Sequence, residues 1–453
     1  MKLPITFAAF VLMASPAMAA CLDVQPNAPT YVDDPATASV LFDSFVINSG
    51  DTSQTCDLSI PSRDGAPVPP EGEISAFSAD YRGFVGPDRP ATLTVTENGV
   101  TRSVVLAPDS ENTLLRTYVG TDADGNLNSD ITMTVAGNDQ DVAGVIESVD
   151  YLLLATTTVD DQFFSLEQVS TARTAVVTHL NSTTGLVLGA NEPLDRDDEV
   201  TAFGAVGSHT VGARGHFNLG DGFSVDGGVA LFDQSVGGAS SSGVLLGGRA
   251  TYLQPEDGSS FRWLGSAGVM AAPGMGLSFS REYLNTATDT MVTGDGSGNG
   301  NLFGIWVEAG ALVAPAPDNE IVFSASLARN WLNFDYAEQQ TDTNPFALTI
   351  DDATSTYDTL KAKAAWTTQI SPDIDLTLHG AVGYINANDD LTGDVALVGA
   401  MTVGGQSEAF VEYGARLGWS FAENARWDVF ALGSTGAETG THAQIGTAVS
   451  MKF

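Results

Sequence analysis

From about residue 200 to the C-terminus, apolar residues alternate with polar or very small ones. Counted back from Phe453, Met451 and Val449 fall on one face of the pattern, and Lys452 and Ser450 fall on the other. A period of two is that of a β-strand, whose successive side chains point to opposite faces of the sheet. The pattern therefore predicts a long series of strands, each apolar on one face and polar on the other.

Twelve strands fit this pattern. Their expected lengths, about 10 to 18 residues, exceed the five or six usual in globular proteins and suffice for a tilted membrane strand of about 9–11 residues. Aromatic residues fall near many strand ends, as the interfacial girdles of a membrane barrel require. The strands are expected near 200–218, 222–236, 242–254, 260–271, 275–286, 301–314, 319–334, 355–370, 372–386, 405–421, 425–434 and 439–453.

The connections between these strands differ in length. Tight ones are expected near 271–276, 315–319, 371–373 and 422–424, and long ones across 287–300, 335–354 and 387–404, with a mobile glycine-rich tip at 294–300. Short turns at one end and long loops at the other are typical of an outer-membrane barrel, whose short turns face the periplasm. Polar residues of the opposite phase are then expected to face the lumen: Arg249, Arg262, Glu308, Lys361, Glu412 and Arg416.

One segment before the strands has a helical period. In residues 160–181, apolar side chains such as Phe163, Leu166, Val169 and Val176 recur at spacings of three and four. This pattern predicts a single helix of about 20 residues, ended by the glycines at 185 and 189. We therefore divide this part of the chain into a linker helix, 159–190, and a barrel, 199–453.

Residues 20–158 read as short strands between turns. The clearest signal is Asn98-Gly99 between two alternating runs, because both residues of a tight hairpin turn need positive φ. Six or seven short strands predict a small antiparallel β-sandwich. The fold class expected for the whole chain is thus all-β, with a sandwich, a helix and a twelve-stranded barrel in that order.

The first residues resemble an export signal. A positive start at Lys2, an apolar run and the small residues Ala17-Met18-Ala19 predict a signal peptide over 1–19. The two cysteines, Cys21 and Cys56, follow it, and an oxidising compartment favours one disulfide between them. Lipidation of Cys21 is the alternative, although the leucine expected three residues before a lipidated cysteine is missing.

The charge excludes one class of partner. With 18 Lys and Arg against 56 Asp and Glu, the net charge is −38, which repels the phosphates of nucleic acids. No nucleophile elbow, zinc-protease motif or phosphate-binding loop occurs, and residues 20–158 contain no histidine. We therefore expect neither an enzyme nor a cofactor; hydrolysis at a barrel rim by His379 and Asp375 is a minor alternative.

One acidic segment has oxygen ligands at alternate positions, as calcium loops do. These are Asp122, Asp124, Asn126 and Asp130, but the glycine that such a loop requires after the third ligand is absent. Asp-Gly-Asn is also ordinary turn chemistry. A turn is the expected reading, and calcium binding is the alternative.

Taken together, the order of segments resembles the bacterial autotransporter family, also called type V secretion. The resemblance covers the whole chain: export signal, passenger, one linking helix, twelve alternating strands and a terminal aromatic residue. It implies that the helix threads the barrel lumen and that barrel-insertion machinery reads the last strand, with Phe453, Met451 and Val449. The short passenger, with no long repeat, departs from the large passengers common in the family.

Two functions follow from these expectations. The first is a monomeric autotransporter, embedded in outer-membrane lipid, that displays residues 20–158 at the cell surface as a binding or adhesion module for an unknown ligand. The sequence has no Asn-Asn pair in the linker of the kind that some members cleave, so the passenger is expected to stay attached. The second is an outer-membrane channel or structural barrel whose sandwich stays in the periplasm.

Overall fold

The structure, a computed structural model, describes residues 37–46, 53–60, 72–85, 90–97, 100–107, 109, 111–121, 127–135, 144–189, 192–194, 196–256, 259–316 and 318–453. The chain divides into two compact units. The first takes in Met1–Thr158 with Thr286–Thr288, and the second takes in Val159–Asn285 and Asp289–Phe453. The expected signal peptide, 1–19, lies outside the described residues.

The first unit contains two four-stranded antiparallel sheets. Their buried faces supply a core, as expected of a small sandwich: Leu93 and Val95 in one sheet and Tyr81 and Tyr151 in the other are almost completely buried. The hairpin predicted around 98–99 is present, with Glu97 opposite Val100. In strand order the sheets are β1(Thr37–Val46), β8(Gly144–Thr158), β3(Glu73–Val85), β6(Glu111–Gly120), and β2(Ser53–Ile60), β7(Leu127–Val135), β4(Ala91–Glu97), β5(Val100–Leu106).

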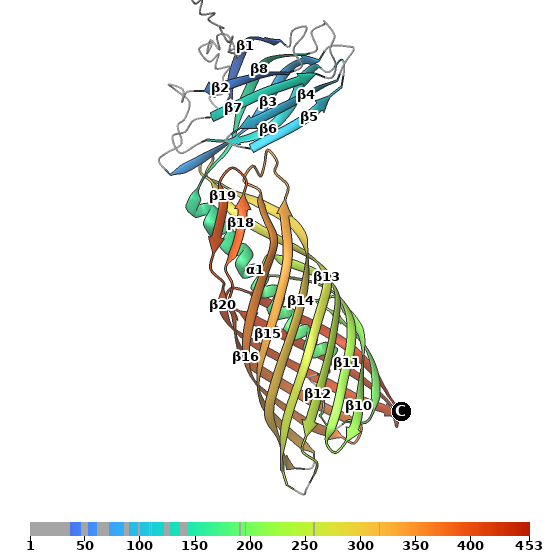
Figure 1. Cartoon of the computed structure of the whole chain (residues 1–453). Helices are drawn as coiled ribbons and strands as arrows, with labels where there is room; N and C mark the ends of the chain where they lie inside the picture. Colours follow the sequence, from blue (N-terminus) through green and yellow to red (C-terminus); the bar gives the residue numbers. More distant parts are fainter. Residues whose placement is uncertain are drawn as a thin grey trace, which may run out of the picture. The chain divides into compact units, whose positions relative to one another are not determined.

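The second unit is a closed antiparallel barrel of twelve strands with one helix, α1(Val159–Val187), in its lumen (Figure 1). Closure comes from pairing of the last strand with the first, Met451 opposite Val200. This confirms the predicted fold class. The strands are β9(Glu199–Val206), β10(Thr210–Gly220), β11(Phe223–Val236), β12(Ala239–Leu253), β13(Phe261–Asn285), β14(Thr290–Ala316), β15(Asn319–Glu338), β16(Leu348–Ser371), β17(Ile374–Ala387), β20(Ser407–Ala422), β21(Ala425–Gly436) and β22(Gly440–Lys452), with a hairpin, β18(Leu391–Val395) and β19(Gly399–Val403), beside β16.

The predicted strand count is right, but two boundaries behind it are wrong and compensate each other. The expected strand 200–218 is two strands, because Gly207 with φ +100° and His209 with φ +37° make a tight turn within it. The expected strands 260–271 and 275–286 are one strand, β13, interrupted by a register shift between Ala272 and Met275. Proline and glycine at 273–274 therefore mark a bulge and not a turn.

The long loops of the prediction are also largely wrong, because strands continue through them. β13 to β16 run for 20 to 27 residues, about twice what a tilted membrane strand needs. The stretch 294–300, expected to be a mobile glycine-rich tip, pairs with β13 and β15. A Cβ on Gly296 would lie 2.5 Å from the Tyr336 ring, so glycine is required there by close packing.

A band of exposed apolar side chains covers the outer face of the barrel. On β14 it includes Phe303, Ile305 and Val307, and Phe303 stacks on Trp331 of β15 with 5.7 Å between ring centroids. An apolar band bounded by aromatic rings is the lipid-facing surface of an outer-membrane barrel. Among the helices of the described ranges, none is both long and apolar enough to cross a membrane.

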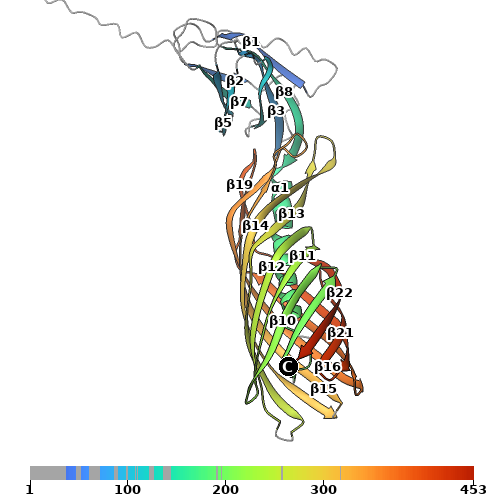
Figure 2. The ribbon, with the colours of Figure 1, turned by 90° about the vertical axis from the view of Figure 1, so that its right-hand side faces the viewer.

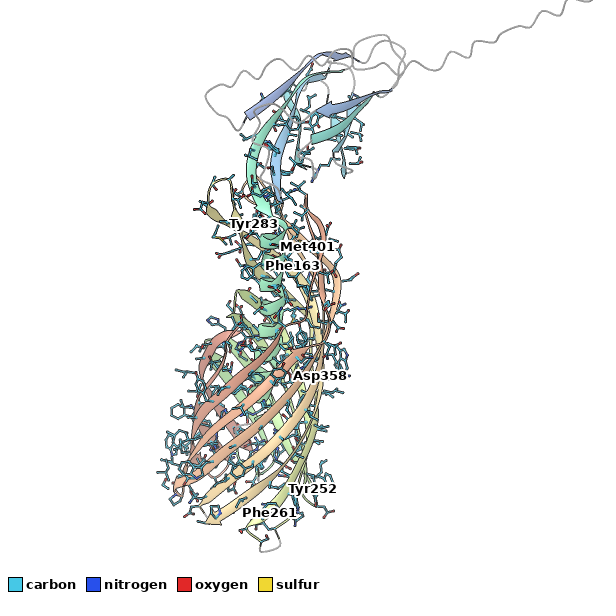
Figure 3. All side chains as sticks on the ribbon, turned by 90° about the vertical axis from the view of Figure 1, so that its left-hand side faces the viewer. Phe163, Tyr252, Phe261, Tyr283, Asp358 and Met401 are labelled. Carbon is cyan, nitrogen blue, oxygen red and sulfur yellow. The ribbon has the colours of Figure 1, made fainter. Side chains whose placement is uncertain are left out.

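The strand segments beyond this band form what we call the collar. It consists of residues 272–285, 290–302, 332–338 and 348–355, with the hairpin β18–β19 and the connection 339–347. Both chain ends of the barrel, at Glu199 and Lys452, lie at the other end, which we call the terminal end. Figure 3 shows Tyr283 and Met401 of the collar at one end of the barrel and Tyr252 and Phe261 at the other.

Candidate functional site in the occupied barrel lumen

The lumen helix begins and ends where local chemistry favours it. Asp160 and Asp161 lie in its first turn, where negative charge offsets the positive end of the helix dipole. Gly189, with φ +62°, ends it, and its N–H donates to the Leu186 carbonyl at 3.2 Å. Of the two glycines expected to end the helix, Gly189 does so and Gly185 lies within it, so the helix is 29 residues long and not about 20.

The middle of the helix is buried on every side. Each residue of 172–180 is buried, which covers more than two turns, so no face of this segment is left to solvent. Three threonines of the helix bond within it: Thr174, Thr178 and Thr184 donate to the carbonyls four residues earlier at 3.2, 2.9 and 2.7 Å. The helix therefore occupies the lumen without leaving these hydroxyls unpaired.

Glycines in the barrel wall let the C-terminal part of the helix approach closely. A Cβ on Gly228 would lie 2.6 Å from the Val187 carbonyl oxygen, and one on Gly247 would lie 3.2 Å from the Leu188 side chain. Contacts this short leave no room for a larger residue at Gly228. The wall and the helix thus fit each other closely at Gly228 and Gly247. Figure 2 shows α1 running inside the barrel.

Near the terminal end, buried charges hold the end of the helix and the segment after it. Arg214 and Arg249 donate to the Leu186 and Leu188 carbonyls at 3.0 Å each, which offsets the negative end of the helix dipole. Arg214 also pairs with Glu192, and Arg249 pairs with Asp226 at 2.8 Å. Arg196 reaches the same Asp226 at 2.9 Å. We call Glu192, Arg196, Arg214, Asp226 and Arg249 the terminal cluster.

In the collar, one ion pair holds the first turns of the helix. Arg281 of β13 pairs with Glu338 of β15 at 2.7 Å, and both side chains are completely buried. Arg281 also donates to the Gln162 side-chain oxygen at 2.8 Å and to the Ser165 hydroxyl at 2.6 Å. These four residues form what we call the collar cluster.

Neighbouring groups complete the hydrogen bonding of Glu338. It accepts bonds from the Tyr336 hydroxyl at 2.8 Å, the Asn344 amide at 3.0 Å and the Leu348 N–H at 3.0 Å. Burial, and then the charge of Glu338, raise the pKa of Tyr336, so its hydroxyl stays protonated and donates. The carboxylate is therefore fully hydrogen-bonded inside the collar.

A third arginine lies on the helix itself. Arg173 is completely buried and donates to the Ser355 hydroxyl at the base of the collar and to the Asp389 carbonyl at 3.0 Å. The sequence-based prediction missed both Arg173 and Arg281. Arg173 carried a usable signal, since it is the one arginine within the helical period of 160–181. Arg281 could have been noticed as a charged residue in the same alternating phase as Leu277, Phe279 and Tyr283, but its partners lie far away in the sequence.

Six polar residues were expected to line the lumen, and the side chains of all six lie on the inner face of the barrel. Arg249 contacts the end of the helix segment, as described above. Lys361 pairs with Glu412 at 3.0 Å, and Arg416 pairs with Asp428 at 2.7 Å and Asp375 at 2.5 Å. Glu308 accepts a bond from Ser266 at 3.2 Å, and Arg262 donates to the Gln254 carbonyl at 2.6 Å near the terminal end. Most of this set therefore bonds along the wall.

A small cavity separates the helix from the wall. Its volume is about 110 Å³, and its lining includes Asn181 and Thr184 of the helix with Lys361, Lys363 and Glu412 of the barrel. One carboxylate oxygen of Glu412 has no protein partner there. The space is polar and large enough for several water molecules.

Two histidines meet elsewhere in the lumen. His179 of the helix and His442 of β22 have ring centroids 4.7 Å apart, and Ser434 lies 3.2 Å from His179 Nδ1. His379 and Asp375 both face inward, but Asp375 is engaged by Arg416 and Arg426. These contacts place the histidines among lumen-facing polar residues.

The remaining predicted sites are the C-terminal strand, the two cysteines and the calcium candidates. Phe453 is exposed, and its N–H donates to the Asp198 carbonyl at 3.2 Å, while Met451 and Val449 belong to the outer apolar band. Cys21 and the calcium candidates Asp122, Asp124 and Asn126 lie outside the described residues, and for Cys56 and Asp130 only strand positions in β2 and β7 are described. Within the described ranges, no group of three or more potential metal-ligating side chains occurs.

Comparison with solved structures finds other β-barrels. The translocator domain of the autotransporter NalP from Neisseria meningitidis is similar at 13% identity and a TM-score of 0.41, covering 62% of this chain and 97% of that one. The β-domain of the Bordetella autotransporter BrkA matches at 12% identity and a TM-score of 0.34, covering 57% and 99%. The NanC porin matches at 11% identity and a TM-score of 0.32, covering 56% and 100%. No protein-family model and no curated sequence matches the chain.

Proposed function

We propose that this protein is an autotransporter-type outer-membrane barrel that carries its N-terminal unit to the cell surface and keeps it attached there. The observation that carries the proposal is the direction of the lumen helix. Its first turns bond to the collar through Arg281, and its end bonds near the terminal end through Arg214. The helix therefore runs through the lumen from the collar toward the terminal end.

The direction of the helix sets the side from which the N-terminal unit leaves. An even number of strands brings both barrel ends to one side, and in outer-membrane barrels that side is the periplasm. The chain before Val159 then leaves at the collar, on the outer side of the membrane. Phe453, at the end of β22, would be the part of the last strand that barrel-insertion machinery reads.

Attachment follows from the contacts at both ends of the helix. The collar cluster and the terminal cluster each bury charged side chains against it, and breaking a buried ion pair costs about 3–5 kcal/mol. A helix held in this way would keep a passenger tethered after export. We propose that the N-terminal unit acts at the surface by binding an unknown ligand, without catalysis, on a monomeric barrel.

Protease treatment of intact cells tests the surface assignment. The N-terminal unit should be digested while a fragment of about the size of Val159–Phe453 survives in the outer membrane, because the barrel and its lumen helix are embedded. A periplasmic marker protein, digested only after lysis, is the control. Survival of the N-terminal unit on intact cells would show that it lies in the periplasm.

The cavity beside the helix favours a second candidate, an ion channel. Lys361, Lys363 and Glu412 line a polar space between helix and wall, and small ions cross a barrel where such space is continuous. Planar-bilayer recordings separate the two candidates. A low conductance that rises sharply when 159–187 is deleted fits the occupied autotransporter, whereas a high conductance with the helix in place fits the channel.

A further inference from the structure

We propose that His179 and His442 form a pH-sensitive switch that displaces the lumen helix from the barrel wall when the medium becomes acidic. His179 lies on α1 and His442 on β22, and their ring centroids are 4.7 Å apart. The two rings are thus in contact across the boundary between helix and wall. The inference rests on the occupied lumen alone, so it holds whether or not the N-terminal unit is displayed at the cell surface.

Neither ring has surroundings that stabilise a charged imidazolium. His179 is 2% exposed and His442 is 9% exposed, and among the described residues the Nε2 atom of each ring has no hydrogen-bond partner. The hydroxyl of Ser434 lies 3.2 Å from His179 Nδ1, and a hydroxyl can either donate to a neutral ring or accept from it. Because burial of a charge without a counter-charge is costly, both rings are neutral while the helix is in place.

The charged groups on the neighbouring elements are bound to other partners. On β20, Glu408 and Glu412 face the lumen near the pair, and Glu412 lies in the row of His442, two strands away. Glu408 accepts the N–H of Thr439 at 3.1 Å, and Glu412 pairs with Lys361 at 3.0 Å. On α1, Arg173 bonds to the collar. The ionisable group in contact with each ring is therefore the other ring.

The pair lies close to the medium, at the end of the barrel away from the terminal end. His442 is the third residue of β22 and follows the turn 437–439, in which Glu438 is exposed. The collar is built from other strands, so it does not lengthen β21 or β22. A Cβ on Gly237, in the turn between β11 and β12, would lie 3.4 Å from the Cβ of Ala175. The helix thus passes the rim of the short strands just before it reaches the histidine pair.

Acid favours the displaced helix because hydrated imidazoles bind protons that the buried ones do not. The ordinary pKa of a hydrated histidine is about 6.5. Between pH 7.5 and pH 5.5, each ring should therefore favour displacement by about tenfold, and the two rings together by about a hundredfold. Hydrated carboxylates ionise near pH 4, so acid in this range acts on the histidines and not on the acidic side chains of the two clusters.

Planar-bilayer recordings of the full chain at pH 7.5 and pH 5.5, at one salt concentration, test the proposal. In acid, the fraction of time spent at a raised conductance should increase about a hundredfold for the unmodified protein and about tenfold for His179→Gln or His442→Gln. The double variant should show no increase. His209→Asn is the control and should keep the full response, because His209 is exposed in the turn between β9 and β10. Its φ of +37° is one that asparagine tolerates.

A fixed charge separates the switch from a purely structural role of the two rings. His442→Lys carries a charge at pH 7.5 and should raise the conductance there, whereas His442→Met, of similar length and uncharged, should not. Heat-modified gel migration at both pH values checks that each variant barrel is folded. Equal conductance of the unmodified protein at both pH values, or an acid response that persists in the double variant, would overturn the proposal. Protease treatment of intact cells does not depend on either result, so surface display and the switch can fail separately.

Discussion

The collar cluster and the terminal cluster hold opposite ends of one helix by different means. The collar depends on one completely buried pair, Arg281 with Glu338, whose hydrogen bonds are made by fixed neighbours. The terminal cluster shares its charges, since Asp226 contacts both Arg196 and Arg249, and Glu192 contacts both Arg196 and Arg214. Loss of one partner of a single ion pair leaves the other charge buried without a counter-charge. In a shared network, the remaining charges still pair with one another.

The largest effect is expected from Arg281→Met. It leaves Glu338 buried without a counter-charge, which should lower the free energy of unfolding by about 3–5 kcal/mol. Amide hydrogen exchange in residues 159–171 should accelerate, because the first turns of the helix lose their anchor. Urea denaturation measures the stability, and mass spectrometry after exchange measures the local opening.

The double variant Arg281→Met with Glu338→Leu is the matched control for that prediction. Replacing both charges by apolar groups removes the unpaired carboxylate, so much of the lost stability should return. If the double variant is as unstable as the single one, the buried charge is not the cause of the loss.

A smaller effect is expected from Arg214→Met in the terminal cluster. It removes one bond to the Leu186 carbonyl and one to Glu192, but Arg196 still pairs with Glu192. Loss of bonds to a charged group costs about 1.5–3 kcal/mol, and the shared network keeps this near the lower value. Urea denaturation beside Arg281→Met makes the comparison, and a larger loss in Arg214→Met would reverse it.

Gly228→Ala tests the fit between wall and helix. The added Cβ would meet the Val187 carbonyl at 2.6 Å, so the helix end must shift, at a cost of about 1–3 kcal/mol. Gly265→Ala is the control, because a Cβ there meets nothing within 4 Å. Hydrogen exchange at 180–187 should accelerate in the first variant alone; equal exchange in both would show that the fit is loose.

The smallest effect on the folded barrel is expected from deletion of Phe453. Its side chain is 74% exposed, so the free energy of unfolding should change by no more than about 0.5 kcal/mol. If barrel-insertion machinery reads this residue, the amount of barrel in the outer-membrane fraction should nevertheless fall. Unchanged amounts in that fraction would remove Phe453 from the assembly signal.

Sequence reasoning found the parts of this fold that repeat. The alternation counted back from Phe453 predicted which faces of the strands meet lipid, and the lumen residues Arg249, Lys361 and Glu412 follow from that phase. It was wrong where one residue type, here glycine, can serve either a flexible loop or close packing in a strand. Glycines at 294–300 indicated a mobile tip, but in the collar they provide room for Tyr336 and Glu338.

Thus the sequence by itself determined the class of the protein, because side-chain alternation along one strand decides which face is apolar. Only the tertiary structure decided which charges meet. Arg281 and Glu338 are 57 residues apart, and Arg281 and Ser165 are 116 apart, so their pairing depends on the register between strands and on where the helix lies in the lumen.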